Sequence, residues 1–197
     1  MIIVFDLGRV IVDFDLSKVS RTLAAVSGAR EPDIISFMFE NDLSRAHDLG
    51  TITGKDFFES LRRKFNFPLT FEQFMPIWNE IFTLIPGMEE LITKLKASYR
   101  VGLLSNTNKL HFDYIAETYP VIRGMDWFLS CDLHLMKPDQ AIYRKVADFY
   151  RVPPSEIFFT DDMRQNIVGA QQAGMHAVQF QSPDQLRSEL TGCGITV

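Results

Sequence analysis

Cysteine, basic charge and long apolar stretches are all scarce in this chain of 197 residues. Its two cysteines, Cys131 and Cys193, form no C-x-x-C pair, so we expect free thiols in a reducing compartment rather than a zinc site or a disulfide framework. A formal net charge of −5 argues against nucleic acid as a partner, because a phosphate backbone binds to a basic surface. No apolar run approaches the roughly 18 residues that would span a bilayer, and residues 1–6 lack the basic start of a signal peptide. We therefore expect a soluble, cytoplasmic protein without a membrane partner.

Three widespread catalytic and nucleotide-binding motifs are also missing. The sequence contains no G-x-S-x-G, no G-x-x-x-x-G-K-[ST] and no G-x-G-x-x-G motif. Serine-hydrolase, P-loop and dinucleotide-binding functions are therefore without support. The composition, with 46% hydrophobic and 23% charged residues, is that of an ordinary globular protein.

Short apolar runs alternate with segments whose apolar residues recur at helical spacing. The runs lack polar alternation, which is typical of strands that are covered on both faces, and we predict strands at residues 2–5, 101–104, 127–129, 157–159 and 176–180. Helical spacing is found at residues 88–95, 142–149 and 167–170. This repetition predicts an α/β fold, a doubly wound parallel sheet with helices on both faces. In such a sheet, ligands bind at the carboxyl ends of the strands.

The strand–helix repetition is interrupted once, after the first strand. Helical periodicity and a concentration of phenylalanine fill the gap, with helices expected at residues 17–26, 33–40, 54–65 and 71–82. We predict a core made of residues 1–14 and 87–197, and an inserted helical cap of residues 15–86. The cap forms an aromatic-packed bundle, and its inner surface would select substrates.

Four polar clusters fall just beyond the ends of predicted strands. Asp6 comes after the first strand, Ser105 begins a Ser-Asn-Thr-Asn segment after the second, Lys137 precedes a proline, and Asp161 and Asp162 follow the run at 157–159. Each cluster alone is more often a cap or a turn. Since the carboxyl ends of parallel strands meet at one edge of the sheet, we expect these side chains to converge on a single point.

The residue types at that point indicate phosphoryl transfer. Carboxylates held close together repel one another unless a cation lies among them, and oxygen ligands favour Mg²⁺. A metal ion with lysine and serine donors suits a phosphoryl group, whose transfer needs charge neutralisation. A carboxylate that faces the phosphorus atom is a nucleophile of the aspartyl-phosphate kind, and we assign that role to Asp6.

The order and separation of these clusters resemble the haloacid dehalogenase superfamily of phosphohydrolases. The resemblance covers essentially the whole chain, and the helical insert matches that superfamily's C1 cap. Within the superfamily, Phe5-Asp6-Leu7-Gly8, the segment from Leu104 to Asn108, Lys137-Pro138 and Phe159-Thr160-Asp161-Asp162 with Asn166 are similar to the bacterial α-D-glucose-1-phosphate phosphatase group.

The resemblance implies a role for each matching residue. Asp6 would attack phosphorus, Ser105 and the backbone around Asn106 would hold a phosphoryl oxygen, and Lys137 would neutralise the nucleophile and the transferring group. These residues would bind the substrate, and Mg²⁺ would be the cofactor. The implied ligands of the metal are Asp6, Gly8 through its carbonyl oxygen, Asp161 and Asp162.

Gly8 is a departure from the superfamily's pattern. Its phosphatases usually carry a second aspartate at this position as general acid and base, and glycine cannot protonate a leaving group. Because acid–base help is worth roughly 10²–10⁴-fold in rate, alkyl phosphates should react slowly, whereas a sugar 1-phosphate has a better leaving group.

We therefore expect a Mg²⁺-dependent phosphomonoester hydrolase that acts on a small phosphorylated metabolite, such as the sugar phosphate glucose 1-phosphate. One alternative is a 2-haloacid dehalogenase, which works without metal and tolerates Gly8 but does not need Asp161 and Asp162. Another alternative is a non-catalytic binding protein with a degenerate site. A mutase would need the acid that Gly8 lacks. Whether the chain forms a homodimer stays open.

Overall fold

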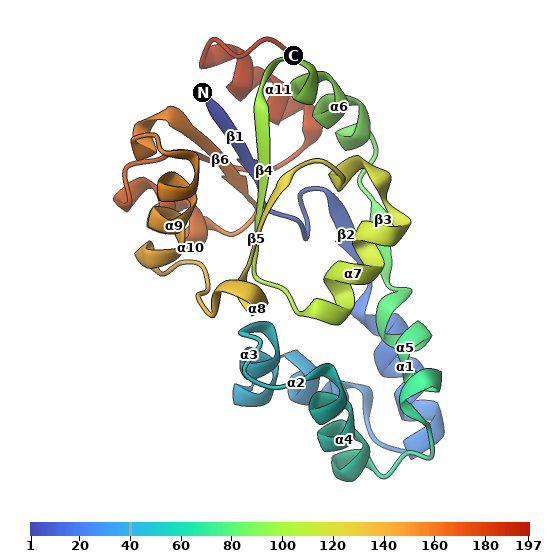
Figure 1. Cartoon of the computed structure of the whole chain (residues 1–197). Coiled ribbons are helices and arrows are strands. Elements are labelled where there is room, and N and C mark those ends of the chain that lie inside the picture. Colours follow the sequence, from blue (N-terminus) through green and yellow to red (C-terminus); the bar gives the residue numbers. More distant parts are fainter. Residues whose placement is uncertain (40) are drawn as a thin grey trace.

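A five-stranded parallel sheet forms the centre of the molecule. The computed structural model describes residues 1–39 and 41–197, and Figure 1 shows the sheet with helices on both sides. The strand order is β5-β4-β1-β6-β7, with parallel pairing throughout. The strands of this sheet are β1 (Ile2–Phe5), β4 (Arg100–Ser105), β5 (Asp126–Leu129), β6 (Ile157–Asp161) and β7 (His176–Gln179).

Alternate side chains of the strands point to opposite faces of the sheet and pack into two separate apolar clusters. On β1, Ile3 and Phe5 pack into a cluster with helices α6, α7 and α11, whereas Val4 packs into a second cluster with α9 and α10. All three side chains are buried, because a parallel sheet is covered on both faces. The bounds of these helices are α6 (Met88–Ser98), α7 (Lys109–Thr118), α9 (Gln140–Tyr150), α10 (Arg164–Gln172) and α11 (Pro183–Gly192). The doubly wound α/β fold predicted from the sequence is confirmed.

Two core helices and several short elements were missing from the sequence-based prediction. Helix α7 begins directly after the polar segment 105–108, where Asn108 accepts a hydrogen bond from the backbone N–H of His111 as its N-cap. The structure also contains α11, and the short elements are α8 (Ser130–Leu133), η1 (Pro120–Ile122) and η2 (Pro154–Glu156). None of the helices in the described part of the chain combines the length and the apolar character needed to cross a membrane.

The segment between the first and second core strands folds into five helices with an apolar cluster of their own. Phe57, Phe58, Phe74 and Trp78 are fully buried in this cluster. Figure 1 shows these helices beyond the carboxyl ends of the sheet strands. Of the helix expected at 33–40, Glu40 lies outside the described residues. The helices are α1 (Leu16–Ser27), α2 (Glu31–Phe39), α3 (Asp42–Asp48), α4 (Gly54–Phe65) and α5 (Phe71–Asn79).

A short antiparallel ribbon lies where the chain leaves and re-enters the core. It consists of β2 (Val12–Phe14) and β3 (Phe82–Leu84), and the rings of Phe14 and Phe82 pack edge-to-face across it. The helix expected at residues 71–82 was therefore too long, since α5 ends at Asn79. The apolar run beyond Asn79 resembles a helix in sequence, but its pairing with β2 makes it a strand. The division into a core (1–14 and 87–197) and a cap (15–86) stays a prediction.

Candidate active site

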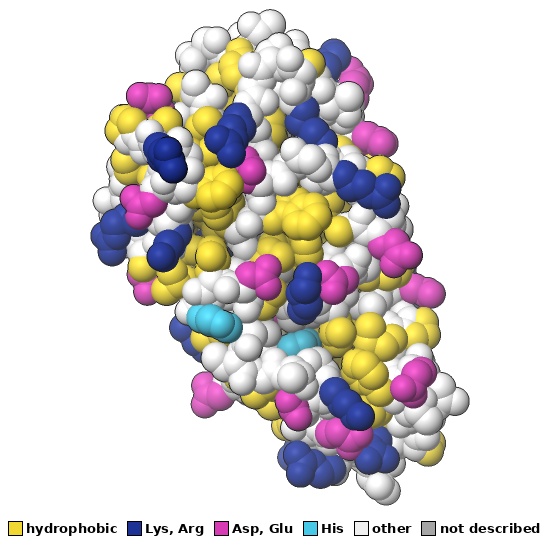
Figure 2. All heavy atoms as spheres, viewed as in Figure 1, with side chains coloured by type: hydrophobic (Ala, Val, Ile, Leu, Met, Phe, Trp, Pro, Cys, Tyr) yellow, Lys and Arg dark blue, Asp and Glu magenta, His cyan; other side chains and the backbone are white. Residues whose placement is uncertain are grey.

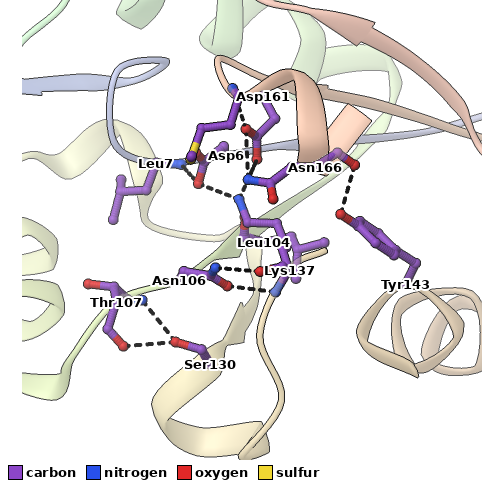
Figure 3. Close-up of polar contacts among 11 residues, drawn as sticks. Asp6, Leu7, Leu104, Asn106, Thr107, Ser130, Lys137, Tyr143, Asp161 and Asn166 are labelled. Atoms are coloured by element: carbon purple, nitrogen blue, oxygen red, sulfur yellow. Dashed lines mark hydrogen bonds and ion pairs between the residues drawn. The ribbon is translucent and has the colours of Figure 1, made fainter. Parts of the chain in front are cut away.

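A buried ion-pair network lies at the carboxyl ends of β1 and β6. The Nζ atom of Lys137 is 2.8 Å from Asp6 Oδ1 and 2.6 Å from Asp161 Oδ2, and it donates a third contact to the carbonyl oxygen of Leu104. Figure 3 shows this ammonium between the two carboxylates. Burial alone would lower the pKa of Lys137, but the two neighbouring carboxylates outweigh it and raise this pKa. The lysine is therefore a fixed positive charge at neutral pH.

Hydrogen bonds hold Lys137 and Asp161 in place. The amide of Asn106 donates to the carbonyl oxygen of Lys137 at 2.9 Å and accepts from its backbone N–H at 2.8 Å (Figure 3). Asp161 accepts from the side-chain amide of Asn166 at both carboxylate oxygens and from the backbone N–H of Met163. The side chain of Asn106 is thus used to position the lysine.

Asp6 combines deep burial with one unengaged carboxylate oxygen. Both its contact with Lys137 and the hydrogen bond from the N–H of Leu7 fall on Oδ1, and within the described residues Oδ2 has no hydrogen-bond partner. Burial raises the pKa of Asp6 to about 7, with Lys137 acting in the opposite direction and Asp161 in the same one. Asp6 thus has one anchored oxygen and one that is available for bonding to an electrophile.

Three carboxylates at this edge fit a divalent cation. Asp6, Asp161 and Asp162 each offer an oxygen atom, and these atoms lie within 4.8 Å of one another. The pKa of Asp162 is raised by burial and by the charge of Asp161. When ionised, the three carboxylates outweigh the buried Lys137 ammonium, which Arg9 supports only at Asp162 among the described residues, and their oxygen donors match the preference of Mg²⁺. The residues present therefore suit this metal.

Gly8 lies beside this cluster, and a side chain at this position would fit tightly. A Cβ atom at this position would approach Cε1 of Phe14 to 3.1 Å. Phe14 in turn packs against Arg9, whose guanidinium lies 4.5 Å from the ring centroid and forms an ion pair with Asp13. Arg9 thus contacts Phe14 and Asp13 of the ribbon, and a side chain at position 8 would require the Phe14 ring to shift by a few tenths of an ångström.

A cavity of about 170 Å³ opens from this site toward the inserted helices. Gly8 and Ser105 line it on the core side, and Phe39, His47 and Trp78 line it on the insert side. Among the described residues that line it, none is lysine or arginine. The exposed surface differs, since Figure 2 shows acidic and basic side chains mixed over the visible face.

Two buried histidines line this cavity in their neutral form. The ring of His47 stacks on Phe57, and burial lowers its pKa to about 4. The ring of His111 stacks on Trp78, and burial lowers its pKa to about 3. Within the described residues, His47 Nε2 and Trp78 Nε1 are buried without a hydrogen-bond partner. Both atoms are therefore sealed within the aromatic packing on the insert side of the cavity.

Asp48, the last residue of α3, joins the insert to the core at the same cavity. Its Oδ1 accepts a hydrogen bond of 3.2 Å from the amide of Asn108, and its carbonyl oxygen accepts one of 2.6 Å from Ser130 Oγ. The carbonyl oxygen of the next residue, Leu49, lies within hydrogen-bond distance of Nδ1 of His134, at 2.7 Å. Burial raises the pKa of the Asp48 carboxyl to about 6, while the Asn108 amide lowers it.

The structure brings the sequence-predicted site residues together, although their individual roles stay predictions. Ser105 is buried and lines the cavity, and its strand β4 neighbours β1. The positions not identified from the sequence are Asp48, Trp78 and Asn108. An Asn-x-x-His spacing after a strand was a signal for Asn108 as a helix cap. Whether the side chains of Asp48 and Trp78 face the cavity depends on how the inserted helices pack against the core, and the local sequence does not predict this packing.

The chain matches known proteins along most of its length. Residues 3–180 match the family model described as "Haloacid dehalogenase-like hydrolase". A D-ribitol-5-phosphate phosphatase from Bacteroides thetaiotaomicron is 28% identical and aligns over 96% of this chain and 96% of that protein. A flavin mononucleotide hydrolase from Arabidopsis thaliana is also 28% identical, over 59% of this chain and 48% of that protein.

Solved structures share the fold. A HAD family enzyme from Bacteroides thetaiotaomicron, in complex with magnesium and inorganic phosphate, superposes with a TM-score of 0.83 at 23% identity, covering 92% of this chain and 94% of that chain. A dehalogenase superposes with a TM-score of 0.68 at 20% identity, covering 95% and 96%. At these identities the likeness concerns the fold.

Proposed function

The chain belongs to the haloacid dehalogenase-like hydrolase family, and we propose that it is a Mg²⁺-dependent phosphatase that releases phosphate from a small phosphorylated metabolite. The observation that carries this proposal is the buried Lys137 ammonium, held between Asp6 and Asp161 beside a cluster of three carboxylates. Such a site provides a carboxylate nucleophile, a fixed ammonium beside it and oxygen ligands for a divalent cation, and phosphoryl transfer requires this combination of nucleophile and positive charge. The similarity to a D-ribitol-5-phosphate phosphatase over almost the full length of both chains supports the same chemistry.

In the proposed reaction, Oδ2 of Asp6 attacks phosphorus and forms an aspartyl-phosphate. Lys137 stays bound to Oδ1 of Asp6 and offsets the charge of the transferring group, and Ser105 donates a hydrogen bond to a phosphoryl oxygen. Asn106 keeps the lysine in position and offers its backbone to the same group. Mg²⁺, held by Asp6, Asp162 and the carbonyl oxygen of Gly8 with Asp161 beside them, would supply further positive charge at the phosphoryl oxygens.

The cavity supports a small and uncharged leaving group. Its volume of about 170 Å³ lies below the range of roughly 300–1,000 Å³ that drug-sized ligands occupy. A second phosphate or a carboxylate on the substrate would enter a space that no lysine or arginine among the described residues lines. Aromatic side chains line the cavity together with the polar side chains of Ser44, Thr107 and Asn108, and this mixture suits the alternating C–H and O–H groups of a polyol. We therefore propose a sugar or polyol monophosphate, with glucose 1-phosphate as the candidate that the sequence favours.

The site disfavours the dehalogenase alternative. A 2-haloacid carries a carboxylate that needs a cationic partner inside the cavity, and the carboxylates of Asp161 and Asp162 have no part in halide displacement. The non-catalytic alternative has Gly8 as its support, whereas the nucleophile and its lysine are both in place.

Phosphate release from a substrate panel tests the proposal. The panel contains glucose 1-phosphate, glucose 6-phosphate, D-ribitol 5-phosphate and p-nitrophenyl phosphate, each with Mg²⁺ and with EDTA. Asp6→Asn serves as the inactive variant, and Asp42→Asn, which changes an exposed acid at the start of α3, is the matched control. We expect release that requires both Mg²⁺ and Asp6. Absence of release from every compound, or halide release from 2-chloropropionate, would contradict the proposal.

A further inference from the structure

Phosphoryl transfer to Asp6 leaves one chemical task unassigned. An alkyl leaving group departs as an alkoxide and needs a proton, and the position that commonly supplies it holds Gly8. In this structure Phe14 fills the space beside Gly8. A proton donor, if the chain has one, must therefore come from another element that borders the same cavity.

Three titratable side chains line the cavity within the described part of the chain: His47, Asp48 and His111. Burial keeps both imidazoles neutral near pH 7, with pKa values of about 4 and 3, and a neutral imidazole is a poor acid. The pKa of Asp48 is about 6, close to neutrality, where a group can both give and accept a proton. By elimination, Asp48 has the chemistry that the site lacks.

The contacts of Asp48 tie it to the core segment that begins at Ser105. Its carboxylate is held by Asn108, which follows the phosphoryl-binding segment that begins at Ser105, and its backbone is held by Ser130. Ser130 Oγ also accepts a hydrogen bond from the N–H of Thr107, so the same segment supports both groups (Figure 3). Asp48, Gly8 and Ser105 all line the one cavity.

We propose that Asp48, contributed by the inserted helices, is the general acid and base of the reaction in place of the residue missing at Gly8. The inference rests on the phosphatase function proposed above. It assigns a catalytic role to a residue outside the core sheet.

The proton movements balance over the two steps. When Asp6 Oδ2 bonds to phosphorus, the bond from phosphorus to the leaving oxygen breaks, and the protonated carboxyl of Asp48 gives its proton to that oxygen. A water molecule then attacks the aspartyl-phosphate and gives its proton to the Asp48 carboxylate. The bond between phosphorus and Asp6 breaks, inorganic phosphate leaves, and both aspartates return to their starting states.

The test compares leaving groups that differ in their need for a proton. The two substrates are p-nitrophenyl phosphate, whose leaving group departs as a stable anion, and the alkyl phosphate of the panel that the wild type hydrolyses fastest. In Asp48→Asn, which retains an oxygen for Asn108, we expect kcat/KM for the alkyl phosphate to fall about 10²–10³-fold and kcat/KM for the aryl phosphate to fall less than about 10-fold. Asp42→Asn is the control on the same helix and should leave both values unchanged.

A second readout separates the base role from a structural one. Because kcat/KM reports only the formation of the aspartyl-phosphate, slow hydrolysis of the intermediate appears in kcat. Asp48→Asn should therefore release a burst of one equivalent of p-nitrophenolate followed by slow turnover. An equal loss of kcat/KM for both substrates, or no loss for either, would overturn the inference. Failure of the proposed function itself looks different, since the wild type would then hydrolyse neither substrate.

Discussion

The buried histidine His47 makes stability depend on pH in a way that one substitution can isolate. Its side chain is 3% exposed, and its folded-state pKa is about 4, against 6.5 for a solvated histidine. Between these two values the unfolded chain binds the proton and the folded chain does not. The free energy of unfolding therefore falls as the pH drops below about 6.5, and this loss is complete near pH 4.

The pKa difference sets the size of the effect. A gap of about 2.5 units corresponds to at most about 3.4 kcal/mol, of which about 2 kcal/mol falls between pH 7 and pH 5. In His47→Gln the group that titrates is gone, while a polar side chain of similar length stays against Phe57. The lost stacking lowers stability by the same amount at every pH. The difference between wild type and variant should therefore shrink by about 2 kcal/mol on going from pH 7 to pH 5.

Urea unfolding at pH 7, 6 and 5, followed by tryptophan fluorescence, measures this difference directly. Titrating groups that do not sense His47 are shared by the two proteins and cancel in the comparison, whereas His111, whose pKa the charge of His47 lowers, changes the difference in the same direction. An unchanged m-value would show that the denatured states are equivalent. If wild type and His47→Gln lost stability in parallel, His47 would titrate like a solvated histidine, and the argument that its Nε2 is sealed inside the aromatic wall would fail.

Three further substitutions test the ion pair and the close packing. Lys137→Met should lower the free energy of unfolding at pH 7 by about 3–5 kcal/mol, because two buried carboxylates lose their partner, and an unchanged urea midpoint would refute this. Gly8→Asp should cost about 1–3 kcal/mol through its clash with Phe14, and adding Phe14→Leu should restore much of the Tm; a single variant as stable as wild type contradicts the packing argument. Gly50→Ala should lower the Tm, since Gly50 has φ +68° and a Cβ would overlap the carbonyl oxygen of Cys131; a thermal scan equal to wild type would count against it.

The strands and the site residues that follow them could be predicted because their signals are local. The run at 2–5 is apolar without interruption, and Asp6 ends it at the edge where parallel strands converge. The same rule located Asp161 at the end of β6, whereas Lys137 lies past β5 and the short helix α8, and the structure places the charged atoms of the two residues 2.6 Å apart. A parallel topology thus turns distant positions in sequence into neighbours in space.

The insert could be predicted only as helical, because its docking depends on contacts that no local pattern encodes. Helical spacing does not say whether His47 or Asp48 faces the cavity, since both follow from how α3 meets α8 through Ser130. The antiparallel ribbon of β2 and β3 was not predicted, for a similar reason. Each of its strands has three residues, and the partner of Val12 is Leu84, far along the chain.

The position of β1 in the sheet has a consequence for the order of folding during synthesis. Ile2 pairs with Arg100 on one side and with Ile157 on the other, so this first strand emerges from the ribosome long before either neighbour exists. The insert helices contact one another at short range and can form meanwhile. The strand β6 pairs with β1 only late in synthesis and brings Asp161 to Asp6, and β7 then adds to the free edge of β6. Chains truncated before β6 would leave one apolar edge of β1 unpaired and would aggregate. The solubility of a series of truncated chains therefore measures at which length the surroundings of Asp6 are complete.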